Sequence, residues 1–112
     1  MEHDPKGYVF DILQACKHIQ KFTAGRNFDD YTSDMLLKSA VERQLTTIGE
    51  ALNKLKKEAP DLSGRIGEEE KIIAFRNVIV HGYDIISDQM VWDIVSTKLD
   101  NLIEDCMKLI DK

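Results

Sequence analysis

The sequence predicts an all-α fold, a four- to five-helix up-and-down bundle. Apolar residues recur at helical spacing along most of the chain, and the β-branched runs are short and lie inside helical periods. Only two prolines and six glycines interrupt the 112 residues, so long regular elements are expected. A chain of this size buries enough surface for one core but not for two. We therefore expect a single domain over residues 1–112.

The first predicted helix covers residues 5–23. Asp4 and Pro5 form a helix start, because a carboxylate can cap the free amide groups and proline suits the first helical position. Gly25 follows closely on the last turn and indicates a stop. The apolar residues of this helix share one face, and they are Val9, Ile12, Leu13, Cys16 and Ile19.

A second, longer helix is predicted from Asn27 to Pro60. Asn27 can cap it, and Asp29 and Asp30 lie in the first turn, where the helix dipole favours acids. A near-heptad apolar stripe follows, which suits packing in a bundle and consists of Leu37, Val41, Leu45, Ile48, Leu52 and Leu55. Residues 61–67 contain two glycines, a serine and little apolar material, so they are expected to form the main loop.

Two further helices complete the prediction. Three glutamates at residues 68–70 open the third, which ends near His81 and is expected to be largely buried because apolar residues cover most of its circumference. Ser87 can cap the fourth. Its apolar residues repeat with steps of three and four, and they are Trp92, Val95, Leu99, Leu102, Cys106 and Leu109.

The charge balance and the cysteines narrow the class of protein. Lys and Arg number 15 against 20 Asp and Glu, and the net charge of −5 argues against a non-specific nucleic-acid coat, DNA included. It does not exclude a nuclease whose basic groups are gathered in one place. No signal peptide or bilayer-spanning stretch is apparent, so a cytoplasmic protein without a membrane partner is expected. Cys16 and Cys106 lack zinc-site spacing and are expected to be reduced core residues.

Polar residues gather at the end of the otherwise apolar third helix. Arg76, Asn77 and His81 stand there, and Tyr83 follows just past Gly82. A buried Arg or Asn without a partner costs several kcal/mol, so these groups either pair internally or line a cleft. Asn77 and His81 share a face, whereas Arg76 lies about 140° from His81. Arg76 and His81 meet on one ligand only if the Arg stem reaches around, the helix ends at His81 or a second subunit contributes.

Two readings of this cluster follow from its chemistry. In the functional one, His81 moves the proton of a 2′-hydroxyl or of the leaving oxygen, and Arg76 stabilises the charge of a phosphorane in metal-free RNA cleavage. In the structural one, which spacing alone favours, Arg76 pairs with a core acid such as Glu50 and His81 caps the helix. Glu50, next to Gly49, could orient Arg76 or lie at a subunit interface.

A resemblance favours the functional reading. Residues 76–83, Arg-Asn-Val-Ile-Val-His-Gly-Tyr, resemble the R-x4-H-x-Y motif of the HepT-like family, within the HEPN superfamily. Residues 11–13, 40–51 and 91–95 resemble the same family, so that the resemblance covers nearly the whole chain. It implies a HEPN-like helical bundle that dimerises through its long helices. It also implies a toxin of a toxin–antitoxin pair that acts as a metal-independent endoribonuclease, with RNA as substrate and no cofactor.

The resemblance assigns roles residue by residue. It makes Arg76 and His81 catalytic, and Asn77 a supporting residue that orients His81. The antitoxin of the family is a MntA-type nucleotidyltransferase that transfers AMP from ATP onto the motif tyrosine, which is Tyr83 here. AMP at that position would add negative charge at the mouth of the cleft and repel RNA phosphates. The alternative is that Tyr83 packs its ring over the helix end.

Two expectations concern assembly and a different class of function. The stripe of the second helix is about 30 residues long, more than one small bundle needs to bury, so a homodimer is expected. The second function is a non-enzymatic HEPN adaptor that binds nucleotide or a nucleotidyltransferase. The Arg, His and Tyr residues of the motif together favour the toxin, because an adaptor has no evident need for all three.

Overall fold

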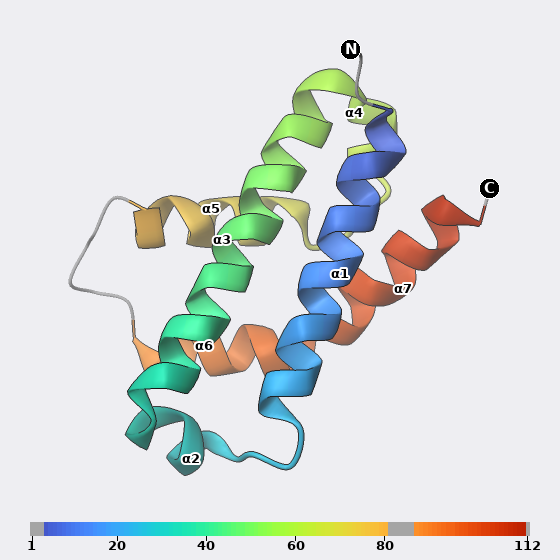
Figure 1. Cartoon of the computed structure of the whole chain (residues 1–112). Helices are drawn as coiled ribbons and strands as arrows, with labels where there is room; N and C mark the ends of the chain where they lie inside the picture. The colour runs from blue at the N-terminus through green and yellow to red at the C-terminus, as the bar shows by residue number, and fades with distance from the viewer. Residues whose placement is uncertain (1–3, 81–86, 112) are drawn as a thin grey trace.

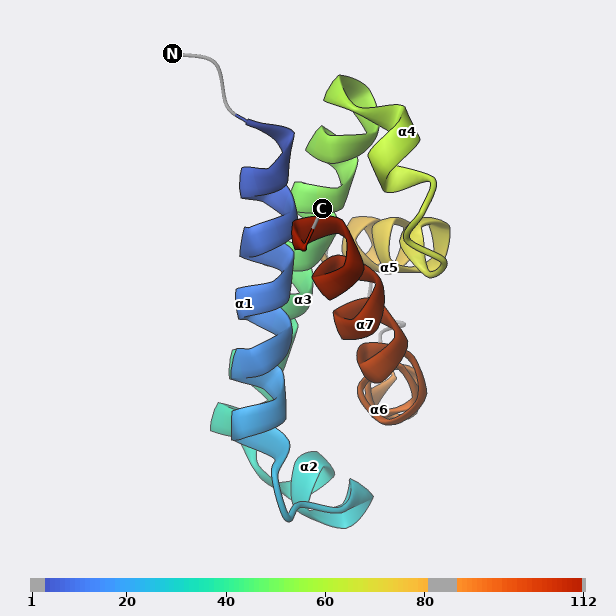
Figure 2. The same cartoon turned by 90° about the vertical axis from the view of Figure 1, so that its right-hand side faces the viewer.

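The computed structural model describes residues 4–80 and 87–111, apart from the side chains of residues 78–80. All regular elements in these ranges are helices, which confirms the all-α prediction. The two longest, α1 (Pro5–Thr23) and α3 (Met35–Glu58), run side by side in opposite directions (Figure 1). α5 (Glu69–Val80) crosses behind this pair, and α7 (Leu99–Ile110) packs against α1 (Figures 1 and 2).

The first predicted helix is confirmed as α1. The Asp4 carboxylate accepts a hydrogen bond from the Lys6 amide at 2.9 Å, and Pro5 occupies the first turn. The chain leaves α1 through Gly25, whose φ of +73° is the left-handed conformation that glycine adopts without strain. The buried residues of α1 are the predicted apolar face together with Ala15.

The second predicted helix is wrong in one respect, because the chain breaks it at Asp34 into α2 (Phe28–Ser33) and α3. Asp34 has an extended backbone, with φ −120° and ψ 99°, and its amide donates to the Tyr31 carbonyl at 3.4 Å. Its carboxylate accepts from the Leu37 amide at 3.0 Å, a bond that lowers the pKa of Asp34. One residue therefore ends α2 and begins α3. Asn27 caps α2 as predicted.

The apolar stripe of α3 is buried within the chain itself. All its predicted members are buried: Leu37, Val41, Leu45, Ile48, Leu52 and Leu55. They pack against the buried faces of the other helices in one hydrophobic cluster. The stripe itself, on which the sequence argument for a homodimer depended, therefore leaves no excess apolar surface. The large hydrophobic side chains of α3 that do stay exposed are Met35 and Leu36, at its start.

Residues 61–67 do not form a simple loop as predicted. Pro60 starts the one-turn helix α4 (Pro60–Ser63), and the Gly64 amide donates to the Pro60 carbonyl at 2.9 Å. A single turn is too short to show apolar periodicity, which explains why the sequence pattern missed it.

The fourth predicted helix is three consecutive segments. Ser87 caps α6 (Asp88–Asp93) as predicted, since its hydroxyl accepts from the Met90 amide at 3.1 Å. A π-helical turn, η1 (Ile94–Lys98), then joins α6 to α7. The wider turn rotates the residues before it relative to those after it.

This rotation corrects the predicted core at the start of that helix. Val91 is buried there, whereas Trp92 and Val95, which the periodicity had placed in the stripe, are only partly buried. Trp92 instead packs on Tyr31 of α2, with ring centroids 5.4 Å apart. A Lys38–Asp88 ion pair of 3.1 Å also holds the start of α6 to α3.

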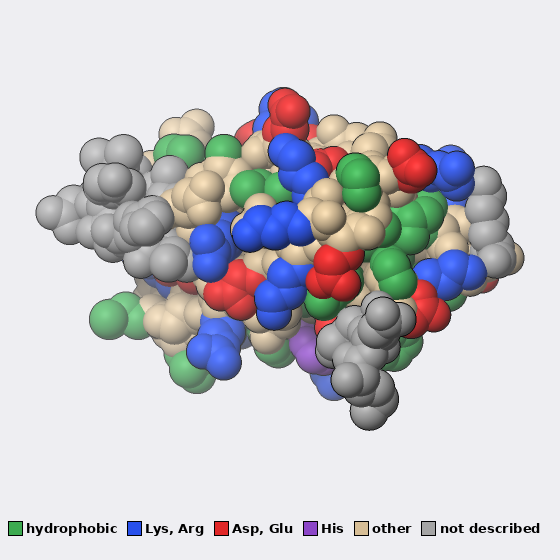
Figure 3. Space-filling view, turned by 90° about the horizontal axis from the view of Figure 1, so that it is seen from above, with side chains coloured by type: hydrophobic (Ala, Val, Ile, Leu, Met, Phe, Trp, Pro, Cys, Tyr) green, Lys and Arg blue, Asp and Glu red, His purple; other side chains and the backbone are tan. Residues whose placement is uncertain are grey.

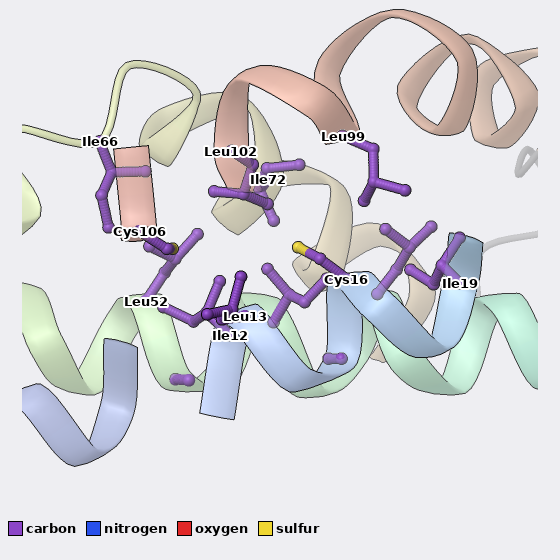
Figure 4. Packing of buried hydrophobic residues seen from close by; sticks show 14 of the residues in the cluster. Ile12, Leu13, Cys16, Ile19, Leu52, Ile66, Ile72, Leu99, Leu102 and Cys106 are labelled. Atoms are coloured by element: carbon purple, nitrogen blue, oxygen red, sulfur yellow. The ribbon is translucent and has the colours of Figure 1, made fainter. Parts of the chain in front are cut away.

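The two cysteines lie in the centre of the core, as predicted. Figure 4 shows Cys16 on α1 and Cys106 on α7 among aliphatic side chains of the surrounding helices. Both side chains are buried and form no disulfide. Burial raises the pKa of Cys106 to about 12 and raises that of Cys16 as well. The thiols are therefore protonated at neutral pH.

None of the helices in the described ranges combines the length and the apolar character that crossing a membrane requires.

Candidate functional site

Arg76 lies on α5 where this helix crosses α3. Its Nη2 atom is 3.4 Å from Oε1 of Glu50 on α3, and its Nη1 donates to Oδ1 of the neighbouring Asn77 at 3.0 Å. The Arg76 side chain is 22% exposed and that of Glu50 is 49% exposed. The guanidinium is thus held from two sides and still reaches solvent.

Gly49 makes the close crossing of α3 and α5 possible. A Cβ atom at this position would collide with Cβ of Arg76 and would lie 2.6 Å from its Cγ. Such a separation is shorter than any ordinary contact between carbon atoms, which is about 3.5–4.0 Å. The aliphatic stem of Arg76 therefore lies directly over the backbone of α3, one residue away from the Glu50 carboxylate.

The Nε atom of Arg76 faces the protein interior. It is buried, and the described residues offer it no hydrogen-bond partner. A buried donor left unpaired costs about 1–3 kcal/mol. Because this unpaired donor is unfavourable, the other contacts of Arg76 must hold the side chain in this position.

These contacts can be compared with the predicted site. Arg76 pairs with Glu50, as the structural reading expected, but Glu50 is a half-exposed residue of α3 and not a core acid. Asn77 is exposed, and the partner that the structure gives it is Arg76. His81 and Tyr83 lie outside the described residues, so the orientation of His81 by Asn77 and the roles of His81 and Tyr83 stay predictions.

The sequence reasoning missed the part that Gly49 plays. The signal for it was available, because a glycine inside a long helix costs about 1 kcal/mol relative to alanine and usually has a packing reason. The sequence pattern does not show which residue packs against Gly49. That residue is Arg76 of α5, which lies 27 positions further along the chain.

Glu50 also faces a polar groove between α1 and α3. The groove encloses about 360 Å³, and its walls include Asp11, His18, Gln44, Thr47 and Lys54. Across it, Nδ1 of His18 lies 3.4 Å from Oε1 of Gln44. The carboxylate of Glu50 therefore stands between this groove and Arg76.

A second hollow lies between α5 and the α6–η1 segment. It encloses about 450 Å³ and is lined mainly by apolar side chains, among them Ile72, Phe75, Met90 and Ile94, with Lys71 and Lys98 also in its wall. Arg76 is not among its lining residues, so this hollow is separate from the Arg76–Glu50 site.

Charges of both signs share the end of the molecule that carries α4. Figure 3 shows Lys and Arg side chains across the middle of this face with Asp and Glu next to them. One such pair joins Lys56 of α3 to Glu69 of α5 at 3.9 Å. This face is therefore not a continuous basic surface of the kind that coats nucleic acid.

Fold and site together define an all-α protein that presents an arginine, held at a helix crossing, to solvent. Comparison with known proteins identifies its family. Residues 12–109 match the family model described as "Ribonuclease HepT-like". The chain therefore belongs to the HepT-like ribonuclease family.

Curated relatives agree with this assignment. A Methanocaldococcus jannaschii protein named "Putative RNase MJ0127" is 30% identical over 96% of this chain and 88% of its own length. One from Caldanaerobacter subterraneus, named "Putative RNase TTE0752", is 27% identical over 96% of both chains. The "Probable ribonuclease HepT" of Thermococcus cleftensis is 28% identical over 91% of this chain and 92% of its own. No solved structure matches the chain significantly.

Proposed function

We propose that this protein is a metal-independent endoribonuclease and the toxin of a toxin–antitoxin pair. The observation that carries the proposal is the guanidinium of Arg76, the first residue of the R-x4-H-x-Y motif, which is anchored on two sides and open to solvent. The family to which the chain belongs is described as ribonuclease-like, which supports the same activity.

The reaction that suits these residues is an internal transfer of the phosphoryl group. The 2′-oxygen of the RNA forms a bond to phosphorus, the bond from phosphorus to the 5′-oxygen breaks, and the products are a 2′,3′-cyclic phosphate and a 5′-hydroxyl. Arg76 stabilises the negative charge that builds on the non-bridging oxygens. His81 transfers the proton, either from the 2′-hydroxyl or to the leaving 5′-oxygen.

The purified protein is expected to cleave single-stranded RNA in excess EDTA, because arginine and histidine supply the charge stabilisation and the proton transfer. The 3′ ends of the fragments should carry a cyclic phosphate, which mass spectrometry identifies. A reaction that stops on chelation and returns with a divalent cation would contradict the metal-free mechanism. Failure to cleave any RNA, with a nucleotidyltransferase still bound, would favour the non-enzymatic adaptor.

A MntA-type nucleotidyltransferase is the proposed antitoxin, and Tyr83 is the proposed acceptor of AMP. The acceptor would lie two residues beyond His81, separated from it by Gly82 alone. A nucleotide attached there brings a negatively charged phosphate close to the proposed proton-transfer group, where it repels the phosphates of RNA.

A homodimer is part of the proposal, and it rests on membership of the family. Light scattering at micromolar concentration is expected to give twice the mass of the chain, which is 12.8 kDa. Because the apolar stripe of α3 is buried within the chain, the interface must use other residues. Met35 and Leu36, at the start of α3, are 82% and 80% exposed and are available for it. A monomeric mass under these conditions would contradict the dimer.

A further inference from the structure

We propose that Glu50 is the positioning residue for Arg76: it fixes the guanidinium so that two N–H groups remain directed at the oxygens of a bound phosphodiester. The inference depends on the proposed function for the identity of the ligand, and on the geometry of the α3–α5 crossing for everything else.

The donors of Arg76 can be counted one by one. A guanidinium carries five N–H groups in a rigid planar fork. Nε is buried, Nη1 gives one N–H to Asn77, and Nη2 points one toward Glu50. One N–H remains on each terminal nitrogen. Two N–H groups on the two terminal nitrogens of one guanidinium can bind two oxygens of a phosphate group.

Fixing such a side chain has a large entropic cost unless the surroundings supply the constraint. An arginine that is held in one geometry gives up much of the rotamer freedom of its long side chain. Two neighbouring residues of α3 supply the constraint here. Gly49 brings the backbone of α3 against the Arg76 stem, and Glu50 engages the far end of the same side chain.

The ion pair does little for the stability of the fold. Glu50 is 49% exposed and the N–O distance is 3.4 Å. Ion pairs this accessible typically contribute little to the free energy of unfolding. Removing the Glu50 carboxylate should therefore release the guanidinium while leaving the bundle folded, which separates a positioning role from a structural one.

A competing role makes the opposite prediction. If Glu50 only occupied Arg76 until RNA displaced it, removing its negative charge would strengthen RNA binding and leave the rate at saturating RNA unchanged or higher. If Glu50 positions Arg76, the rate at saturating RNA falls, because a displaced guanidinium no longer meets the charge of the transition state.

The test compares kcat and KM for RNA cleavage in the wild type, Glu50→Gln, Glu50→Ala and Asp11→Asn. Asp11 is the matched control, because it lines the same groove and carries the same charge, whereas the side chains that bind the Arg76 guanidinium in the described part of the chain are Glu50 and Asn77. We expect kcat to fall by about 10- to 100-fold in Glu50→Ala. The fall should be smaller in Glu50→Gln, which retains an oxygen acceptor, and absent in Asp11→Asn. Melting temperatures should agree within a few degrees. An unchanged or raised kcat in Glu50→Ala would overturn the proposal.

A second measurement does not depend on activity. In the ¹⁵N NMR spectrum of the wild type, the side-chain signals of Arg76, assigned by their loss in Arg76→Lys, should report slow rotation of the guanidinium. Glu50→Ala should speed up that rotation, and Asp11→Asn should not. Faster rotation in Glu50→Ala, together with a wild type that cleaves no RNA, would reject the proposed function and keep the positioning role. Unchanged rotation in Glu50→Ala would reject the positioning role even in an active enzyme.

Discussion

Alanine at Arg76 or at His81 is expected to lower the rate of RNA cleavage by a factor on the order of 10²–10⁴. Arg76→Ala removes the guanidinium that is proposed to stabilise the charge on the phosphate. His81→Ala removes the group proposed to transfer the proton. Initial rates on a labelled single-stranded RNA, measured at saturating RNA, give the size of the loss.

Loss of the fold is excluded as a cause by parallel measurements. Arg76 is partly exposed and its ion pair is accessible, so helicity by circular dichroism and the melting temperature should change little. His18→Ala serves as the histidine control, because His18 is an exposed residue of α1 outside the motif. A variant that keeps wild-type rates after either motif substitution would contradict the assignment of that residue.

Tyr83→Phe is expected to abolish the response to the antitoxin while leaving RNA cleavage intact. Phenylalanine keeps the ring and removes only the hydroxyl that would accept AMP. With the partner nucleotidyltransferase and ATP, intact-mass analysis should show AMP added to the wild type and none to the variant. Toxicity on expression should be relieved by the partner in the wild type only.

Two results would point elsewhere. Equal transfer of AMP to the wild type and to Tyr83→Phe would place the acceptor at another residue. Loss of nuclease activity in Tyr83→Phe would mean that the hydroxyl takes part in the chemistry or in substrate binding.

The sequence predicted the elements whose signals are local. The start of α1 at Asp4-Pro5 and the start of α6 at Ser87 were both predicted, because a capping side chain and the amide it satisfies are only a few residues apart. The buried stripe of α3 was predicted for the same reason, since its periodicity persists over many turns.

The errors lie where one local signal overrides another or where a turn is too short to be periodic. The apolar periodicity predicts one continuous helix across Asp34, yet the carboxylate and backbone of this residue end one helix and begin the next. The π turn at residues 94–98 leaves a spacing of three and four almost intact in the sequence while it rotates the buried face.

Half of the candidate site followed from chemistry and half required the fold. The need of Arg76 for an acidic partner, with Glu50 as the example, was predicted from the cost of burying a lone cation. The closeness of Gly49 to the Arg76 stem was not, because it depends on how two helices far apart in the sequence cross. The roles of His81 and Tyr83 are proposed from the sequence motif alone, because both residues lie outside the described part of the chain.

The reactivity of the two buried thiols can serve as a measure of how often the helical core opens. Cys16 on α1 and Cys106 on α7 are fully enclosed, and burial raises the pKa of each, so neither reacts with an alkylating reagent while the helices stay packed. The modification rate under native conditions therefore counts the excursions that separate α1 and α7 from the rest of the core. The same measurement can be made on each variant of the motif. If a variant does not cleave RNA but its cysteines react as slowly as those of the wild type, the substitution has removed the activity and left the core packed.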